Sequence, residues 1–120
     1  LSVHEGPQRI SRASTLPLEP GMILSNEPGY YKEDAYGIRI ENLIVVSPVD
    51  TPEGGDDHRI MYGFETLTWT PIDRRLIETT LLTSQERAWL DTYHATCWEN
   101  LSSRLSPEAK TWLESMTAPL

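Results

Sequence analysis

The sequence predicts an α+β chain in which antiparallel strands are followed by C-terminal helices. Up to residue 70, short runs of alternating apolar and polar residues are separated by turns rich in Gly and Pro, which is typical of strands. After Pro71, apolar residues recur at every fourth position from Trp89 to Leu105, as in an amphipathic helix. We therefore expect two parts, residues 1–72 and residues 73–120.

Composition narrows the functional classes. The chain has 120 residues, of which 38% are hydrophobic, enough for one ordinary domain with a core. Its formal net charge of −8 would repel phosphate backbones and anionic lipids. It contains neither a run of about 20 apolar residues nor a signal sequence, and the single Cys97 suits a reducing compartment. We expect a globular cytoplasmic protein without nucleic-acid or membrane partners.

The first residues, LSVHEGP, are typical of the end of a strand that runs into a polar turn. We therefore expect the chain to begin inside a domain. Residues 11–19 are predicted to form a loop, and Pro20-Gly21 a turn.

Two strands are predicted next. Residues 22–26 form a short strand that Pro28 and Gly29 end, because proline lacks the amide that a ladder needs. Residues 29–37 form a connection with Gly at both ends, and residues 38–46 form the second strand.

Glu27 and Glu41 are the most informative residues of the chain. Glu27 ends the first strand and Glu41 lies within the second, so a hairpin brings the two carboxylates to one point. Oxygen ligands of this kind bind hard or borderline divalent metals, and a pair of metals activates water as a nucleophile. Two carboxylates do not complete such a site, so the chain resembles part of a metallohydrolase.

A structural explanation of the same residues is also open. Glu41 lies in the apolar string IRIENLIVV, where an ionised carboxylate costs several kcal/mol unless it is paired. Because side chains alternate along a strand, Arg39 lies on the same face as Glu41, and Ile38 and Ile40 lie on the other. Arg39 can supply the pairing without any metal.

The remaining elements follow from local signals. Residues 47–59 are predicted to form a loop, and residues 61–70 a strand. Thr83 and Glu86 have capping-box spacing at the start of a helix of about five turns. Its apolar side comprises Trp89, Tyr93, Cys97, Leu101 and Leu105, with Leu90 and Trp98 beside them. Ser106-Pro107 starts a second helix, with Trp112, Leu113 and Met116 on its apolar side.

Other chemically capable residues have open or structural interpretations. His4 is a proton carrier or ligand in principle, and a hydrogen-bonding residue before a turn otherwise. His58 and His94 are interpreted as structural or solvated, and Cys97 as packing. The sequence lacks HExxH, paired CxxC, GxSxG and phosphate-binding glycine motifs.

Several strings resemble one family in order and spacing. VHEGP, PGMILSNEPGYY and YGIRIENLIVV are similar to the C-terminal half of the catalytic domain of the aminopeptidase P family, the X-prolyl aminopeptidases among the pita-bread metallopeptidases. FETLTWTPID and LLTSQERAWLDTYHATCW resemble the C-terminal extension of the long, cytosolic-type members. The resemblance implies the C-terminal part of a pita-bread fold, with residues 1–72 as the catalytic half and residues 73–120 as a helical extension.

The resemblance also implies roles for four residues. Glu27 matches a ligand of one metal in a dinuclear centre and a proton shuttle, and Glu41 matches the ligand that bridges both metals. His4 matches a histidine that contacts the peptide and stabilises the tetrahedral intermediate, and Arg39 matches an arginine beside the metal carboxylates. The implied cofactors are two divalent ions, manganese with zinc or cobalt as alternatives. The implied partners are a peptide with proline at its second position and a second copy of the chain in a homodimer.

The family pattern also needs ligands that this sequence lacks. Two aspartates and a histidine would lie upstream of Leu1, so the 120-residue piece is expected to be inactive by itself. Asp34 stands where the family more often has Gly. The alternatives are another pita-bread hydrolase, such as prolidase, methionine aminopeptidase or the metal-free creatinase group, and a metal-free pita-bread pseudo-enzyme or binding module.

Overall fold

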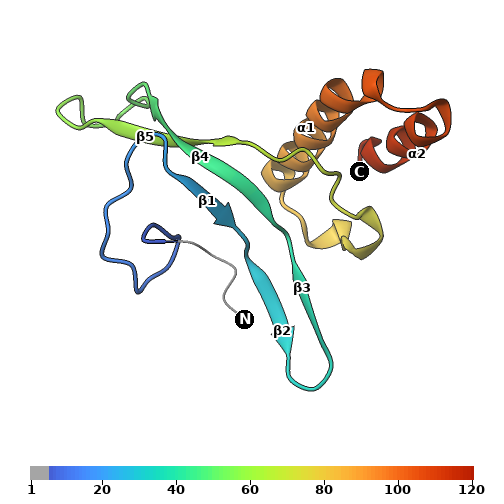
Figure 1. Ribbon diagram of the computed structural model, residues 1–120, viewed down its shortest axis with the longest axis horizontal. Coiled ribbons are helices and arrows are strands. Elements are labelled where there is room, and N and C mark those ends of the chain that lie inside the picture. Colours follow the sequence, from blue (N-terminus) through green and yellow to red (C-terminus); the bar gives the residue numbers. More distant parts are fainter. Residues whose placement is uncertain (1–5) are drawn as a thin grey trace. The chain divides into compact units, whose positions relative to one another are not determined.

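The computed structural model describes residues 6–120, which form two compact units that meet in sequence between Thr68 and Trp69. The first, the sheet unit, contains five strands. The second, the helical unit, contains two α-helices and three short 3-10 helices (Figure 1). None of the helices in this described part of the chain is long and apolar enough to cross a membrane.

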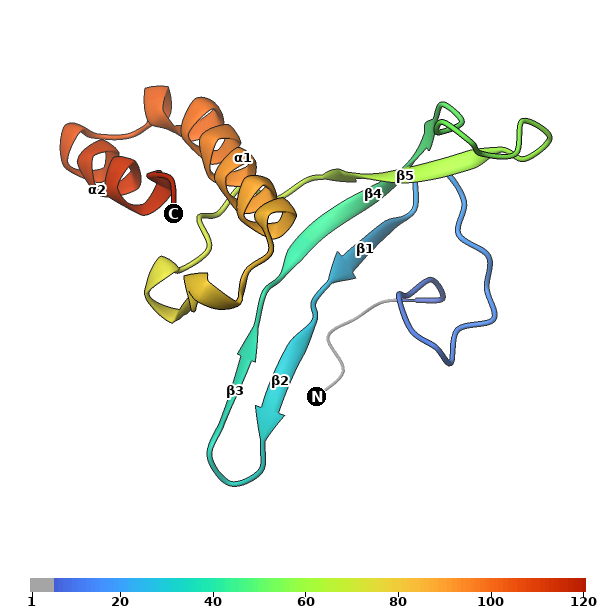
Figure 2. The same ribbon diagram turned by 180° about the vertical axis from the view of Figure 1, so that it is seen from behind.

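All strand pairs of the sheet unit are antiparallel. A three-stranded sheet has the order β1 (Ile23–Asn26), β4 (Asn42–Val49) and β5 (Met61–Thr66). A two-stranded ribbon pairs β2 (Gly29–Lys32) with β3 (Tyr36–Arg39). In Figures 1 and 2, from opposite sides, this ribbon continues β1 and β4 as one long hairpin.

The pairing register is continuous along that hairpin. Asn26 pairs with Asn42 at the end of the sheet, and Gly29 pairs with Arg39 at the start of the ribbon. The turn contains Asp34, whose φ of 55° is left-handed, a conformation that Asp tolerates better than most residues. The predicted connection over residues 29–37 is therefore wrong in extent, because all but the turn residues 33–35 are paired.

The strand predicted over residues 38–46 is divided at Ile40 and Glu41. Pro28 lies opposite Ile40 in the hairpin and has no backbone N–H group to donate, so the regular hydrogen-bond ladder is interrupted there. One hydrogen bond of 3.1 Å, from the Ile40 amide to the Pro28 carbonyl, holds the two segments of the hairpin together across the break.

β4 extends through Pro48 to Val49, so the prediction that residues 47–49 belong to a loop is wrong. At Pro48 only β5 is paired with β4, because the β1 pairing ends at Val45, and proline is tolerated where one side of a strand has no partner. β5 ends at Thr66, four residues before the predicted end. The core of the sheet unit consists of Leu24, Ile44 and Val46, with Leu18 and Met22 packed against them.

Both α-helices of the helical unit begin at the residues that the capping signals predict. α1 spans Ser84–Leu101, and Thr83 and Glu86 form both hydrogen bonds of the capping box. α2 spans Pro107–Thr117, with Ser106 as its N-cap. The 3-10 helices are η1 (Arg74–Leu76), η2 (Thr79–Leu81) and η3 (Ser102–Arg104).

The predicted apolar sides of both helices are only partly correct. Trp89 and Trp112 are 52% and 56% exposed, and the helix ends before Leu105. A strict four-residue repeat drifts by about 40° per step on a helix with 3.6 residues per turn, so its members cannot all face one side. The buried residues of α1 are Leu90, Tyr93, His94 and Cys97.

Candidate functional site: a carboxylate pair on the hairpin

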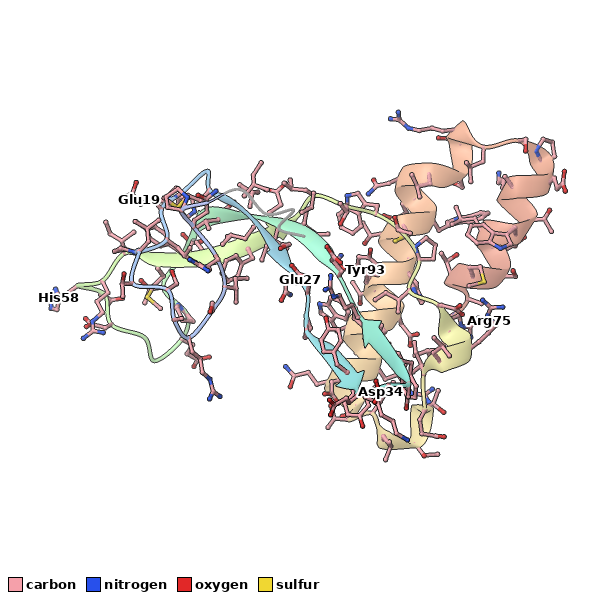
Figure 3. All side chains as sticks on the ribbon, turned by 60° about the horizontal axis from the view of Figure 1, so that its bottom comes forward. Glu19, Glu27, Asp34, His58, Arg75 and Tyr93 are labelled. Atoms are coloured by element: carbon pink, nitrogen blue, oxygen red, sulfur yellow. The ribbon has the colours of Figure 1, made fainter. Side chains whose placement is uncertain are left out.

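Glu27 and Glu41 occupy opposing positions of the long hairpin. Each lies in the short gap between the sheet and the ribbon, one pair beyond Asn26 and Asn42. Directly opposed residues of antiparallel chains have Cβ atoms about 4.5–5.5 Å apart. Figure 3 shows Glu27 where β1 meets β2, with Asp34 at the turn. The hairpin therefore brings the two predicted carboxylates together.

Arg39 lies between the two acids. Its Nη1 is 2.9 Å from Glu27 Oε2 and 4.0 Å from Glu41 Oε2. Like charges placed directly opposite each other in a sheet are destabilising, and the guanidinium offsets that repulsion. The ion pair between Arg39 and Glu27 is the shorter and therefore the stronger of the two.

Tyr31 holds the guanidinium from the other side. Its hydroxyl accepts a hydrogen bond of 2.5 Å from Arg39 Nε, and the guanidinium carbon lies 5.7 Å from the ring centroid. The pKa of Arg39 is raised above its usual range, first by the Tyr31 hydroxyl and then by the charge of Glu27. Arg39 is therefore a permanent cation whose guanidinium group is held by Tyr31 at Nε and by Glu27 at Nη1.

Two glycines make room for the tyrosine ring. A Cβ atom on Gly29 would lie 2.9 Å from the Tyr31 hydroxyl, and one on Gly37 would lie 2.8 Å from Tyr31 Cδ1. Tyr31 is a site residue that was not predicted from the sequence. The signal was present, because Tyr31 lies two residues from Gly29 and opposite Gly37, on the face that also carries Arg39.

The two acids differ in their surroundings. Ser25 Oγ donates a hydrogen bond of 2.8 Å to Glu27 Oε1, so both Glu27 oxygens have protein contacts. The Glu27 side chain is 22% exposed, and that of Glu41 is 47% exposed. As predicted from the alternation of the strand, Glu41 lies on the same face as Arg39, and its side chain is half exposed although its sequence neighbours are apolar.

The remaining candidates are elsewhere. His4 lies outside the described residues. His58 is exposed in the loop between β4 and β5 (Figure 3). His94 and Cys97 are fully buried in the helical unit, in agreement with their structural interpretation.

The chemistry of the carboxylate pair fits a hard divalent cation, because both donors are oxygens on one face. Within residues 6–120, no group of three or more His, Cys, Asp or Glu side chains is placed to hold a metal ion. Divalent cations in proteins take more donors than two carboxylates provide. By themselves, the described residues therefore do not complete a metal site.

Two family models match this chain. Residues 1–48 match metallopeptidase family M24, and residues 60–120 match the C-terminal region of peptidase M24. Over its full length the chain is 45% identical to a probable Xaa-Pro aminopeptidase P of Talaromyces stipitatus and 46% identical to aminopeptidase P2 of Arabidopsis thaliana. It covers 19% and 17% of those proteins, so it spans about a fifth of the length of the curated relatives it matches.

A solved structure has the same fold. The chain superposes on the crystal structure of X-prolyl aminopeptidase from Caenorhabditis elegans with a TM-score of 0.79 and 31% identity, covering 100% of this chain and 20% of that one. That protein is described as a cytosolic enzyme with a di-nuclear active site.

The fold prediction is confirmed by this match. Antiparallel strands followed by helices form the C-terminal part of a pita-bread fold. The carboxylate pair falls within the residues that match the metallopeptidase family, and both helices fall within those that match its C-terminal region. This chain therefore belongs to metallopeptidase family M24.

Proposed function

We propose that this chain is part of a dinuclear-metal aminopeptidase that removes the N-terminal residue preceding proline from peptides. The observation that carries the proposal is the opposition of Glu27 and Glu41 across one hairpin, with Arg39 between them. The relatives named Xaa-Pro aminopeptidases support the reaction and the substrate class.

Each residue has a proposed role. Glu27 would hold one of the metals and would carry a proton, while Ser25 holds its second oxygen. Glu41 would be a ligand of both metals, and Arg39 orients the two acids. His4 contacts the peptide and stabilises the tetrahedral intermediate. The two divalent ions, when bound, supply Lewis-acid activation of water and of the scissile carbonyl.

The cofactor proposal is two manganese ions, with zinc or cobalt as alternatives, because carboxylate donors suit manganese. Residues 1–72 act as the catalytic half and residues 73–120 as the extension. The further ligands lie in a longer protein, so the 120-residue chain alone is inactive. That longer protein is a homodimer, and it is cytoplasmic, as the nematode enzyme is described to be.

The test measures release of the N-terminal residue from an Arg-Pro-Pro peptide by a longer protein that contains this chain. Glu27→Gln and Glu41→Gln should each lower kcat by more than a hundredfold and reduce the manganese content measured by elemental analysis. Glu33→Gln, on the same hairpin but at its turn, is the matched control and should behave like the unchanged protein. Full activity in both site variants would overturn the proposal.

One observation favours a metal-free module as the second candidate. The 2.9 Å ion pair between Arg39 and Glu27 satisfies that acid without any metal. A longer protein with neither bound metal nor cleavage of the peptide would support this alternative. Prolidase is a weaker candidate. Residues 60–120 match the C-terminal region of peptidase M24, and the relatives that are similar over the whole chain, this region included, are named aminopeptidases P.

A further inference from the structure

Residues 69–74, here called the strap, lie against α1 in the helical unit and are held by side chains. The Tyr93 hydroxyl donates a hydrogen bond of 2.8 Å to the Thr70 carbonyl and accepts one of 3.2 Å from the Thr70 amide. Two residues further on, His94 Nε2 accepts a hydrogen bond of 3.1 Å from the Ile72 amide. Adjacent residues of one helix therefore hold alternate residues of the strap by their backbone.

The two ends of the strap are also anchored. Trp69 stacks on the Tyr93 ring, with ring centroids 5.6 Å apart. Arg74 donates hydrogen bonds of 3.0 Å to the Ser115 carbonyl and 2.8 Å to the Pro119 carbonyl, near the C-terminal end of α2. The strap thus joins α1 to α2, and His94 holds its middle.

His94 can hold the strap only as a neutral ring. Its Nε2 accepts the Ile72 N–H, so that nitrogen carries no proton and the ring proton lies on Nδ1. His94 is wholly buried, and its Nδ1 has no hydrogen-bond partner among the residues that the structure describes. A second proton would place N–H donors of His94 and Ile72 against each other, which breaks the contact.

Burial and one nearby cation oppose the uptake of that second proton by His94. Burial lowers the pKa of His94, and the nearby cation of Arg74 in η1 lowers it further. Asp91 on α1 acts in the other direction. The other titratable groups beside His94 on this helix are Tyr93, whose ring centroid is 6.0 Å away, and Cys97, whose pKa burial raises.

We propose that proton uptake by His94 releases the strap from α1, so that the helical unit changes from a strapped form at neutral pH to a released form in mildly acidic solution. In the released form the ring is solvated and titrates near the ordinary value of about 6.5. In the strapped form the Ile72 N–H occupies Nε2, so the proton is taken up by the released form. Acidification to about pH 5.5 therefore favours release by roughly tenfold.

Hydrogen exchange of the Thr70 and Ile72 amides in the 120-residue chain tests this proposal. After correction for the intrinsic exchange rate, their protection should fall about tenfold between pH 7.5 and pH 5.5. His94→Gln replaces the ring by an amide that accepts a hydrogen bond and does not titrate, so its protection should stay constant. His58→Gln removes an exposed histidine of the sheet unit and should retain the tenfold fall.

Three results would overturn the proposal. The first is constant protection in the unchanged chain, and the second is an equal loss in His94→Gln. The third is a parallel loss at the amides of residues 90–97 within α1, which would mean that the whole unit unfolds. If His94→Gln does not fold, an NMR titration of the ring nitrogens of His94 in the unchanged chain decides. At neutral pH the ring proton should lie on Nδ1, and the titration midpoint of His94 should lie below 6.5. A midpoint at or above 6.5 contradicts release.

Discussion

Glu27 and Glu41 face each other because the β1–β4 and β2–β3 pairings share one register, centred on the turn at Asp34. A register shift of one residue would move one acid to the opposite face of the hairpin. Opposed like charges destabilise a hairpin, and Arg39 offsets this cost only in part, at 4.0 Å from Glu41. The opposition of the two acids is the feature on which the proposed cation site rests.

Tyr31→Phe tests the support of Arg39. Without the hydroxyl that accepts from Arg39 Nε, the guanidinium loses one of its anchors, so kcat of the longer protein should fall at least tenfold. The melting temperature should change little, because the ring remains. Tyr30→Phe is the matched control, since Tyr30 pairs with Ile38 on the other face. Equal kinetics of the two variants would contradict a role for the hydroxyl.

Gly37→Ala tests the space beneath the Tyr31 ring. The added Cβ would lie 2.8 Å from Tyr31 Cδ1, so the ring has to move and the ribbon loses about 1–3 kcal/mol of stability. Urea unfolding monitored by circular dichroism measures the loss. Gly6→Ala is the control. Among the described residues, chain neighbours apart, the heavy atom nearest to its Cβ would be the Gln8 amide nitrogen, at 4.0 Å. A Gly37→Ala chain as stable as the control would mean that the ring is not confined.

Asp34→Val tests the left-handed turn. A β-branched residue is strained at a φ of 55°, so the free energy of unfolding should fall by about 1–2 kcal/mol. Asp34→Gly should be as stable as the unchanged chain or more so, because Gly adopts this conformation freely. Both are measured by urea unfolding, with Glu33→Val as the control in the same turn. Equal losses for Asp34→Val and Glu33→Val would show that the conformation at residue 34 is not limiting.

Thr83→Ala tests the start of α1. The variant removes the hydroxyl that accepts a hydrogen bond from the Glu86 amide, and the helical unit should lose about 1 kcal/mol in urea unfolding. Thr92→Ala, within the helix, removes a hydroxyl that bonds only its own helix, at the Ala88 carbonyl, and should cost less. A greater loss in Thr92→Ala would contradict the capping role.

The same cap predicts a dependence on pH. Hydrogen bonds donated by the Thr83 amide and hydroxyl lower the pKa of Glu86 below its usual 4.5. The contribution of this cap is therefore complete above pH 4.5 and is lost as the pH falls through the lowered pKa. Stability curves of the unchanged chain and Glu86→Gln should differ above pH 5, and the difference should shrink as the pH falls below 4.5. A constant difference down to pH 3 would contradict this assignment.

Local sequence signals determined much of this protein. Thr83, Glu86 and Ser106 marked the helix starts, because capping depends on residues within one turn. The alternation of β-strands placed Arg39 with Glu41, and the strings around the two glutamates pointed to the family. These features depend on neighbours in the chain, so the sequence contained them.

Contacts between distant residues required the tertiary structure. The interruption of the strand at Ile40 follows from Pro28 on the opposite segment of the hairpin. The position of the Tyr31 ring follows from the space beside Gly37. The burial of His94 and the exposure of Trp89 depend on which side of α1 the strap covers, and a four-residue repeat does not specify that side. Packing selects one face of each element, and this selection depends on residues far apart in the sequence.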